Sequence, residues 1–145
     1  GVKNILAIAC GISDGLGFGD NSKAALITRG LKELVGFGVA MGGKKETFFG
    51  LSGLGDLVVT ATSKYSRNRY LGEEIGKGRK PREVIQSMKM VAEGYYCVKG
   101  VYLKARELNL SMPITEEVYK VLYENAPPSK SLYSLMKREL KSEFG

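Results

Sequence analysis

The sequence contains no histidine and only two cysteines, which restricts the chemistry that its side chains can perform. Cys10 and Cys97 stand far apart and outside any CxxC pair, so the sequence gives no sign of a zinc site. Histidine is the commonest general base, and without it any acid or base step falls to lysine, aspartate, glutamate, tyrosine or cysteine. We therefore expect a site without a metal ion.

Long hydrophobic runs are also missing. The longest candidate, residues 5–12, is well short of the roughly 18 apolar residues that a membrane-spanning helix needs. The N-terminus lacks the charged start and the small-residue cleavage site of a signal peptide, so we expect a cytoplasmic protein. The chain begins with Gly1 rather than methionine, and its first apolar run follows almost at once, which indicates a piece of a longer protein.

The charge is basic but scattered. Lysine and arginine number 22 against 15 acidic residues, a net charge of +7 that suits nucleic acid, an anionic small molecule or simple solubility. Acidic residues stand between most of the basic groups, and no long basic arm is present. This distribution favours a solvated surface with one anion-binding site.

At 145 residues the chain has the size of one domain, and the periodicity of its apolar residues is helical. Alternation with a period of two is almost absent, and residues 56–63 (DLVVTATS) are the one segment where a strand is an alternative. Asp20 or Asn21 can cap one helix and Ser66 another, prolines can open further ones, and residues 45–50 form a turn. We expect an all-α fold of about eight helices with short connections.

A glycine-rich stretch, GISDGLGFG, follows an apolar segment and precedes a helix, which is the order of a dinucleotide-binding loop. Three observations contradict that function. Gly15, Gly17 and Gly19 are spaced GxGxG instead of GxGxxG, no carboxylate occurs at residues 37–41, and one long helix replaces the expected helix and strand. We interpret the glycines as a break that lets two helices pack closely.

Two groups of residues and one single lysine can carry chemistry. Residues 66–68 stand in the first turn of an expected helix, where backbone N–H groups and a guanidinium can hold a phosphate, although a simple cap with exposed arginines explains them equally well. Asp56 and Thr60 are four residues apart and can face one cleft. Lys3 opens an apolar helix, where partial burial can prepare a lysine for acid or base work, although most lysines at such positions are solvated.

Four ordered motifs carry a family resemblance: KNILAIACGISDGLGFGDNSKAALITRGL, GLSGLGDLVVTATSKYSRNR, VAEGYY and MPITEEVYKVLYE. Together they resemble the bacterial-type NAD(P)-dependent glycerol-3-phosphate dehydrogenase family, and the resemblance covers essentially the whole chain. The matching part is the C-terminal substrate-binding domain, an all-α multi-helix bundle similar to the C-terminal domain of 6-phosphogluconate dehydrogenase-like enzymes. The resemblance implies that residues 1–145 form this single domain and that an N-terminal Rossmann domain precedes Gly1 in the whole enzyme.

The resemblance implies reversible hydride transfer between NAD(P)H and dihydroxyacetone phosphate, which yields sn-glycerol 3-phosphate for phospholipid synthesis. It makes Lys3 the catalytic acid or base. The residues implied to contact substrate are Lys3, Asp56, Thr60, Ser66, Arg67 and Asn68, and those implied to contact NAD or NADP are Arg67, Val91 and Glu93. The Rossmann domain supplies a further lysine, so this chain alone should be inactive, and a second copy of the chain is another candidate partner.

Two other functions remain alternatives at this point. A related helical domain of a hydroxy-acid dehydrogenase also places a catalytic lysine at the start of a helix, and assays with phosphorylated and carboxylated substrates separate the two. A basic helical module for nucleic acid or a protein is the second alternative, with steeply salt-dependent nucleic-acid binding as its signature. The sequence lacks the long interleaving of aromatic and basic residues that would favour such a module.

Overall fold

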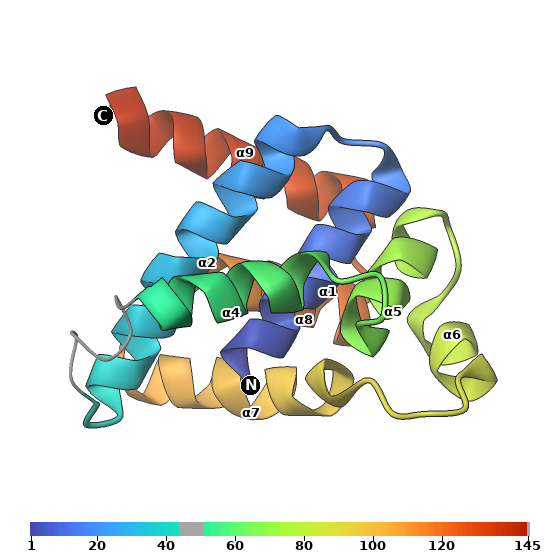
Figure 1. The fold of residues 1–145 in the computed structure, drawn as a ribbon, viewed down its shortest axis with the longest axis horizontal. Helices are drawn as coiled ribbons and strands as arrows, with labels where there is room; N and C mark the ends of the chain where they lie inside the picture. The colour runs from blue at the N-terminus through green and yellow to red at the C-terminus, as the bar shows by residue number, and fades with distance from the viewer. Residues whose placement is uncertain (44–50, 145) are drawn as a thin grey trace.

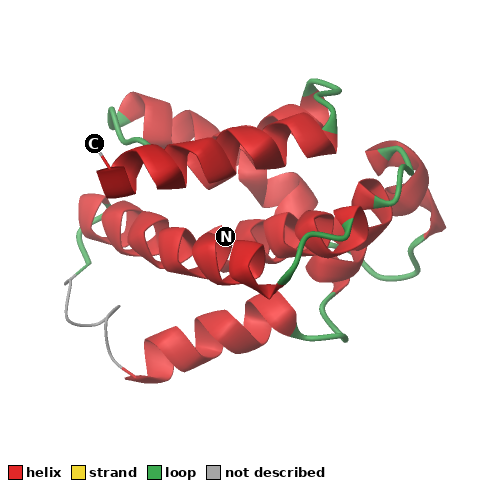
Figure 2. Ribbon diagram, turned by 90° about the horizontal axis from the view of Figure 1, so that it is seen from above, coloured by secondary structure: helices red, strands yellow, loops and turns green. Residues whose placement is uncertain are grey.

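The computed structural model describes the backbone of residues 1–43 and 51–144 and the side chains of residues 1–43 and 55–137, so the turn expected at 45–50 lies outside the described residues. The described part is helical without strands, which confirms the predicted all-α fold (Figure 2). Its elements are α1 (Val2–Leu16), α2 (Asp20–Ala40), α4 (Leu51–Thr62), α5 (Arg67–Gly76), α6 (Pro81–Ser87), α7 (Glu93–Glu107), α8 (Pro113–Tyr123) and α9 (Pro128–Phe144). The segment for which a strand was the alternative therefore belongs to a helix.

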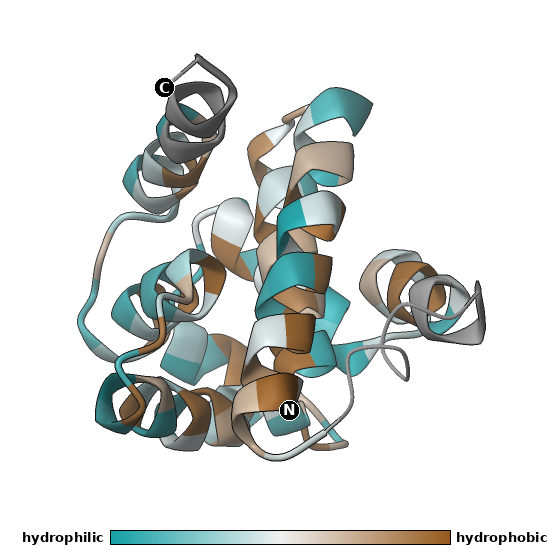
Figure 3. Cartoon of the chain, turned by 90° about the vertical axis from the view of Figure 1, so that its left-hand side faces the viewer, coloured by the Kyte–Doolittle hydropathy of each residue, from teal (hydrophilic) through white to brown (hydrophobic). Residues whose placement is uncertain are grey.

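Helix α1 is the centre of the bundle and packs against α2, α4, α5, α7 and α8 (Figure 1). From Ile5 to Cys10 every side chain is at most 1% exposed, as expected for a helix that is apolar on all sides. The surrounding helices are amphipathic, with hydrophobic and hydrophilic residues on different faces (Figure 3). None of the described helices combines the length and hydropathy needed to cross a membrane.

The glycines between α1 and α2 act at the helix ends. Gly17 has a φ of 81° and ends α1 in the left-handed conformation that glycine adopts without strain. Gly19 is the N-cap residue of α2, and no side chain caps that helix, so the prediction that Asp20 or Asn21 caps it is wrong. Asp20 instead begins the helix, where its negative charge faces the positive end of the helix dipole. The predicted cap of α5 by Ser66 is confirmed.

Glycines bring α1 and α5 into backbone contact, but of the three glycines expected to allow close packing only Gly15 takes part, because a Cβ atom at Gly17 or Gly19 would meet nothing within 4 Å. A Cβ atom at Gly72 would lie 2.0 Å from the carbonyl oxygen of Ile8, and one at Gly11 would lie 2.1 Å from that of Arg69. A Cβ atom at Gly15 would lie 2.2 Å from another carbonyl of α5. The position of α5 on α1 therefore depends on the absence of side chains at this seam.

Glu33 joins α2 to the start of α8. Its side chain is 6% exposed, and its carboxylate accepts hydrogen bonds from the backbone N–H groups of Ile114 (2.8 Å) and Thr115 (3.3 Å). These contacts satisfy N–H groups that a helix start leaves without partners. Burial nevertheless raises the pKa of Glu33 to about 7, against the opposing effects of these hydrogen bonds and of Arg29.

We expect Glu33 to make the protein more stable at acidic than at neutral pH. Because its pKa is raised from 4.5 to about 7 by folding, the folded protein binds the proton more tightly than the unfolded chain between these values. The stabilisation is complete below about pH 4.5 and is lost as the pH rises through about 7, a fall in unfolding free energy of up to about 3 kcal/mol. Urea denaturation at a series of pH values should show this fall in unfolding free energy. Glu33→Gln should abolish the fall, whereas Glu83→Gln, a substitution on the surface, should leave it unchanged. An unchanged slope in Glu33→Gln would exclude Glu33 as its source.

Candidate active site

Lys3 and Asp56 form an ion pair between α1 and α4. The ammonium group of Lys3, in the first turn of α1, donates a hydrogen bond to Oδ2 of Asp56, 53 residues further along the chain. The side chains are 38% and 55% exposed, so both remain accessible to a ligand. The pair therefore offers a proton donor or acceptor whose position is fixed by a neighbouring carboxylate.

Thr60 lies one turn after Asp56 on the same face of α4. In a helix, residues four apart are about 5–6 Å from each other at Cβ, whereas in a strand they would be more than twice as far apart. Thr60 is partly buried. The helical conformation of this segment therefore makes a joint contact of Asp56 and Thr60 with one small substrate geometrically reasonable.

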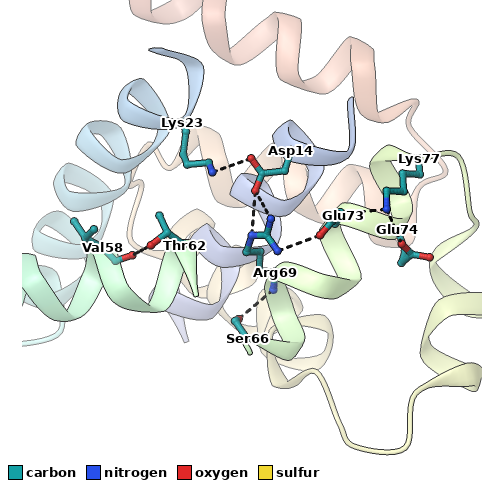
Figure 4. Close-up of polar contacts among 9 residues, drawn as sticks. All are labelled: Asp14, Lys23, Val58, Thr62, Ser66, Arg69, Glu73, Glu74 and Lys77. Carbon is teal, nitrogen blue, oxygen red and sulfur yellow. Dashed lines mark hydrogen bonds and ion pairs between the residues drawn. The ribbon is translucent and has the colours of Figure 1, made fainter. Parts of the chain in front are cut away.

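The first turn of α5 has the properties of an anion site. Ser66 caps the helix, because its Oγ accepts a hydrogen bond of 3.1 Å from the backbone N–H of Arg69 (Figure 4). The hydroxyl hydrogen of Ser66 is left to donate to a ligand. The backbone N–H groups of Arg67 and Asn68 belong to the first turn, which has no preceding carbonyls to bond, and the helix dipole adds positive potential.

Asn68 connects this turn to the start of α7. Its Oδ1 accepts a hydrogen bond of 2.8 Å from the backbone N–H of Gly94, so the amide NH2 group is free to face a ligand. A Cβ atom at Gly94 would lie 2.8 Å from that Oδ1 and 3.1 Å from the carbonyl oxygen of Asn4. Gly94 thereby brings Asn68 next to the residue that follows Lys3.

The residues that the resemblance assigns to the cofactor lie beside Arg67. One terminal nitrogen of Arg67 lies 3.2 Å from the sulfur of Met90, immediately before Val91. Val91 is 58% exposed, and Glu93 is the exposed first residue of α7. Arg67 therefore connects the first turn of α5 to Met90, the residue that precedes Val91.

Known proteins match this chain both in sequence and in fold. The family described as NAD-dependent glycerol-3-phosphate dehydrogenase C-terminus matches residues 1–133. The chain belongs to this family. The glycerol-3-phosphate dehydrogenase (NAD(P)+) of Chlorobium phaeobacteroides is 57% identical over 144 residues, and that of Clostridium acetobutylicum is 53% identical over 143 residues.

A solved structure supports the same relationship. The crystal structure of glycerol-3-phosphate dehydrogenase from Coxiella burnetii matches with a TM-score of 0.89 and 46% identity, over 93% of this chain and 42% of that one. The two bacterial relatives are covered to 43% of their length, against 99% of this chain. The chain thus spans less than half the length of the glycerol-3-phosphate dehydrogenases that it matches.

Three residues beside the candidate site were not predicted from the sequence. Gly94 acts through its backbone, and Asp14 and Arg69 form an ion pair between α1 and α5. The second arginine of SRNR was a visible signal, but nothing in the sequence indicated its partner 55 residues earlier. Among the described residues, no three histidine, cysteine, aspartate or glutamate side chains are arranged to hold a metal ion.

Proposed function

We propose that this chain is the substrate-binding domain of a glycerol-3-phosphate dehydrogenase that interconverts dihydroxyacetone phosphate and sn-glycerol 3-phosphate for phospholipid synthesis. Residues 1–145 are the helical domain, and a Rossmann domain on its N-terminal side completes the enzyme. The family match and the greater length of the relatives support this assignment. The observation that carries it is the Lys3–Asp56 ion pair close to the first turn of α5, because Gly94 lies against both Asn68 of that turn and Asn4, the residue after Lys3.

The proposed chemistry is proton transfer by Lys3. In the oxidation, the secondary hydroxyl of glycerol 3-phosphate gives its proton to the amine of Lys3 as the C–H bond releases a hydride. In the reduction, the ammonium of Lys3 returns a proton to the carbonyl oxygen. Asp56 holds the ammonium in place, and Thr60 can bond the substrate oxygens from the same helix face. NAD(P), when bound, supplies the site that accepts or gives the hydride.

The substrate phosphate is assigned to the first turn of α5. The hydroxyl of Ser66, the backbone N–H groups of Arg67 and Asn68, and the guanidinium of Arg67 can all donate to phosphate oxygens. The amide of Asn68 can do the same, because Gly94 already occupies its oxygen. This set of donors without a carboxylate among them suits a dianionic group.

The side chains of the residues assigned to the cofactor have chemical properties that suit a nicotinamide dinucleotide. Val91 offers an exposed apolar surface to a ring, Glu93 can accept a hydrogen bond, and Arg67 can reach both cofactor and substrate phosphate. The proposal includes a cytoplasmic location. Association into a homodimer stays a prediction.

Arg67→Ala tests the proposed phosphate site. In the complete enzyme we expect the KM for dihydroxyacetone phosphate to rise roughly 10- to 100-fold, because charge-assisted hydrogen bonds contribute about 1.5–3 kcal/mol. Steady-state kinetics provide the measurement, with Arg82→Ala, an exposed arginine of α6, as the matched control. An unchanged KM would remove Arg67 from the phosphate site, and faster turnover of a 2-hydroxy acid would favour a hydroxy-acid dehydrogenase instead.

A further inference from the structure

The guanidinium of Arg69, a residue of α5, is bound by two carboxylates, one on α1 and one on α5. Its Nε and Nη2 lie 3.0 Å and 2.8 Å from Oδ2 of Asp14, and its Nη1 lies 3.0 Å from a carboxylate oxygen of Glu73 (Figure 4). Lys23 of α2 contacts the other oxygen of Asp14 at 2.9 Å. The side chains of Arg69 and Asp14 are only 17% and 15% exposed, so this network is shielded from water far more than an ordinary surface ion pair.

The network acts at the turn assigned to the phosphate. Arg69 follows Asn68 directly, and its backbone N–H donates to the cap residue Ser66. The side chain of Arg69 is tied to Asp14, whereas that of Arg67 is exposed. The turn is therefore fixed to α1 on one side and presents its donors on the other.

Helix α1 also carries the proposed catalytic group. Lys3 stands near its beginning and Asp14 near its end, about 16 Å apart along the helix axis. The glycine seam between α1 and α5 brings the two backbones together but offers few side chains that could interlock and fix the helices along their length. At that seam the guanidinium of Arg69 contacts Asp14 through two of its nitrogens, a fork that fixes the direction of the contact.

We propose that Arg69 and Asp14 are positioning residues for the phosphate: their ion pair fixes the first turn of α5 on the helix that carries Lys3. The inference rests on the proposed function, because it presumes that residues 66–68 hold the substrate phosphate. The distance between phosphate and reacting carbon is fixed in the substrate, so the separation of this turn from Lys3 must match it. A purely structural ion pair, in contrast, would affect only how much enzyme is folded.

The test uses the complete enzyme and two substrates, dihydroxyacetone phosphate and dihydroxyacetone without the phosphate. The ratio of their kcat/KM values is independent of the fraction of folded enzyme. Arg69→Lys, which cannot form the fork, and Asp14→Asn should each lower this ratio roughly 10- to 100-fold, since small misplacements have effects of that size. Arg79→Lys is the matched control. Arg79 lies just beyond the other end of α5 and forms an ion pair with Glu74 at 3.1 Å. This substitution should leave the ratio unchanged.

The outcomes separate the two proposals. If Arg67→Ala lowers the ratio but Arg69→Lys and Asp14→Asn do not, the positioning role is wrong and the proposed phosphate site stands. If Arg67→Ala itself leaves the ratio unchanged, the proposed function fails first. The double variant Asp14→Asn with Arg69→Lys should lose far less than the product of the two single effects, since both substitutions remove the Arg69–Asp14 contact, and fully additive losses would contradict joint action.

A milder variant tests the proposal if Arg69→Lys and Asp14→Asn prevent folding. Lys23→Gln removes the ion pair that holds the other oxygen of Asp14, and with it part of the restraint on the carboxylate that Arg69 binds. We expect the ratio to fall about two- to threefold, with the circular dichroism spectrum unchanged. An unaltered ratio in Lys23→Gln would then overturn the proposal.

Discussion

Replacement of Lys3 by alanine should lower the turnover of the complete enzyme about 10²- to 10⁴-fold, the usual contribution of a positioned acid or base. The KM for the phosphorylated substrate should change far less, because the phosphate is assigned to α5. Lys3 is 38% exposed and its ion pair with Asp56 is accessible to solvent, so its loss should cost little stability. A low kcat in a protein with normal melting behaviour would therefore report on proton transfer.

The control for Lys3→Ala is Lys32→Ala, an exposed lysine on α2. It removes the same charge from the domain without touching the pair with Asp56, so its kcat should stay within about twofold of the unaltered enzyme. Single-turnover measurements with saturating substrate separate the chemical step from product release. Turnover close to normal in Lys3→Ala would contradict the proposed role of this lysine.

The helices were largely predictable because their signals are local. Apolar residues at helical spacing marked α1, and the prolines and Ser66 marked the starts of other helices. The prediction failed where the local rules gave no decision: Gly19, not Asp20, occupies the N-cap of α2. For residues 56–63 the β-branched residues suited a strand, and packing against α1 decides for a helix.

The assembly of the candidate site was not predictable from spacing. Lys3 and Asp56 are 53 residues apart, and Asn68 meets Gly94 across 26 residues. No periodicity encodes such pairs, because they depend on how the helices pack around α1. The family resemblance supplied the residue set, whereas the geometry adds what holds it: a backbone N–H at Gly94 and the guanidinium of Arg69.

Gly72→Ala should destabilise the folded domain strongly, because it places a side chain where α5 touches α1. A Cβ atom at this position would lie 2.0 Å from the carbonyl oxygen of Ile8 and 2.8 Å from the backbone nitrogen of Ile12. Neither atom can move aside as a flexible side chain would, so α5 must move away from α1. We expect a loss of about 3 kcal/mol or more in unfolding free energy, at the upper end of overpacking effects, measured by urea denaturation.

Gly100→Ala is the matched control, because Gly100 lies within α7 and a Cβ atom there would meet nothing within 4 Å. Alanine should stabilise the protein at this position by about 0.5–1 kcal/mol, through its higher helix propensity. Equal effects of the two substitutions would contradict the backbone contact between α1 and α5. Because the same displacement would move residues 66–68 relative to Lys3, folded Gly72→Ala enzyme should also discriminate less well between phosphorylated and phosphate-free substrate, whereas Gly100→Ala should discriminate normally.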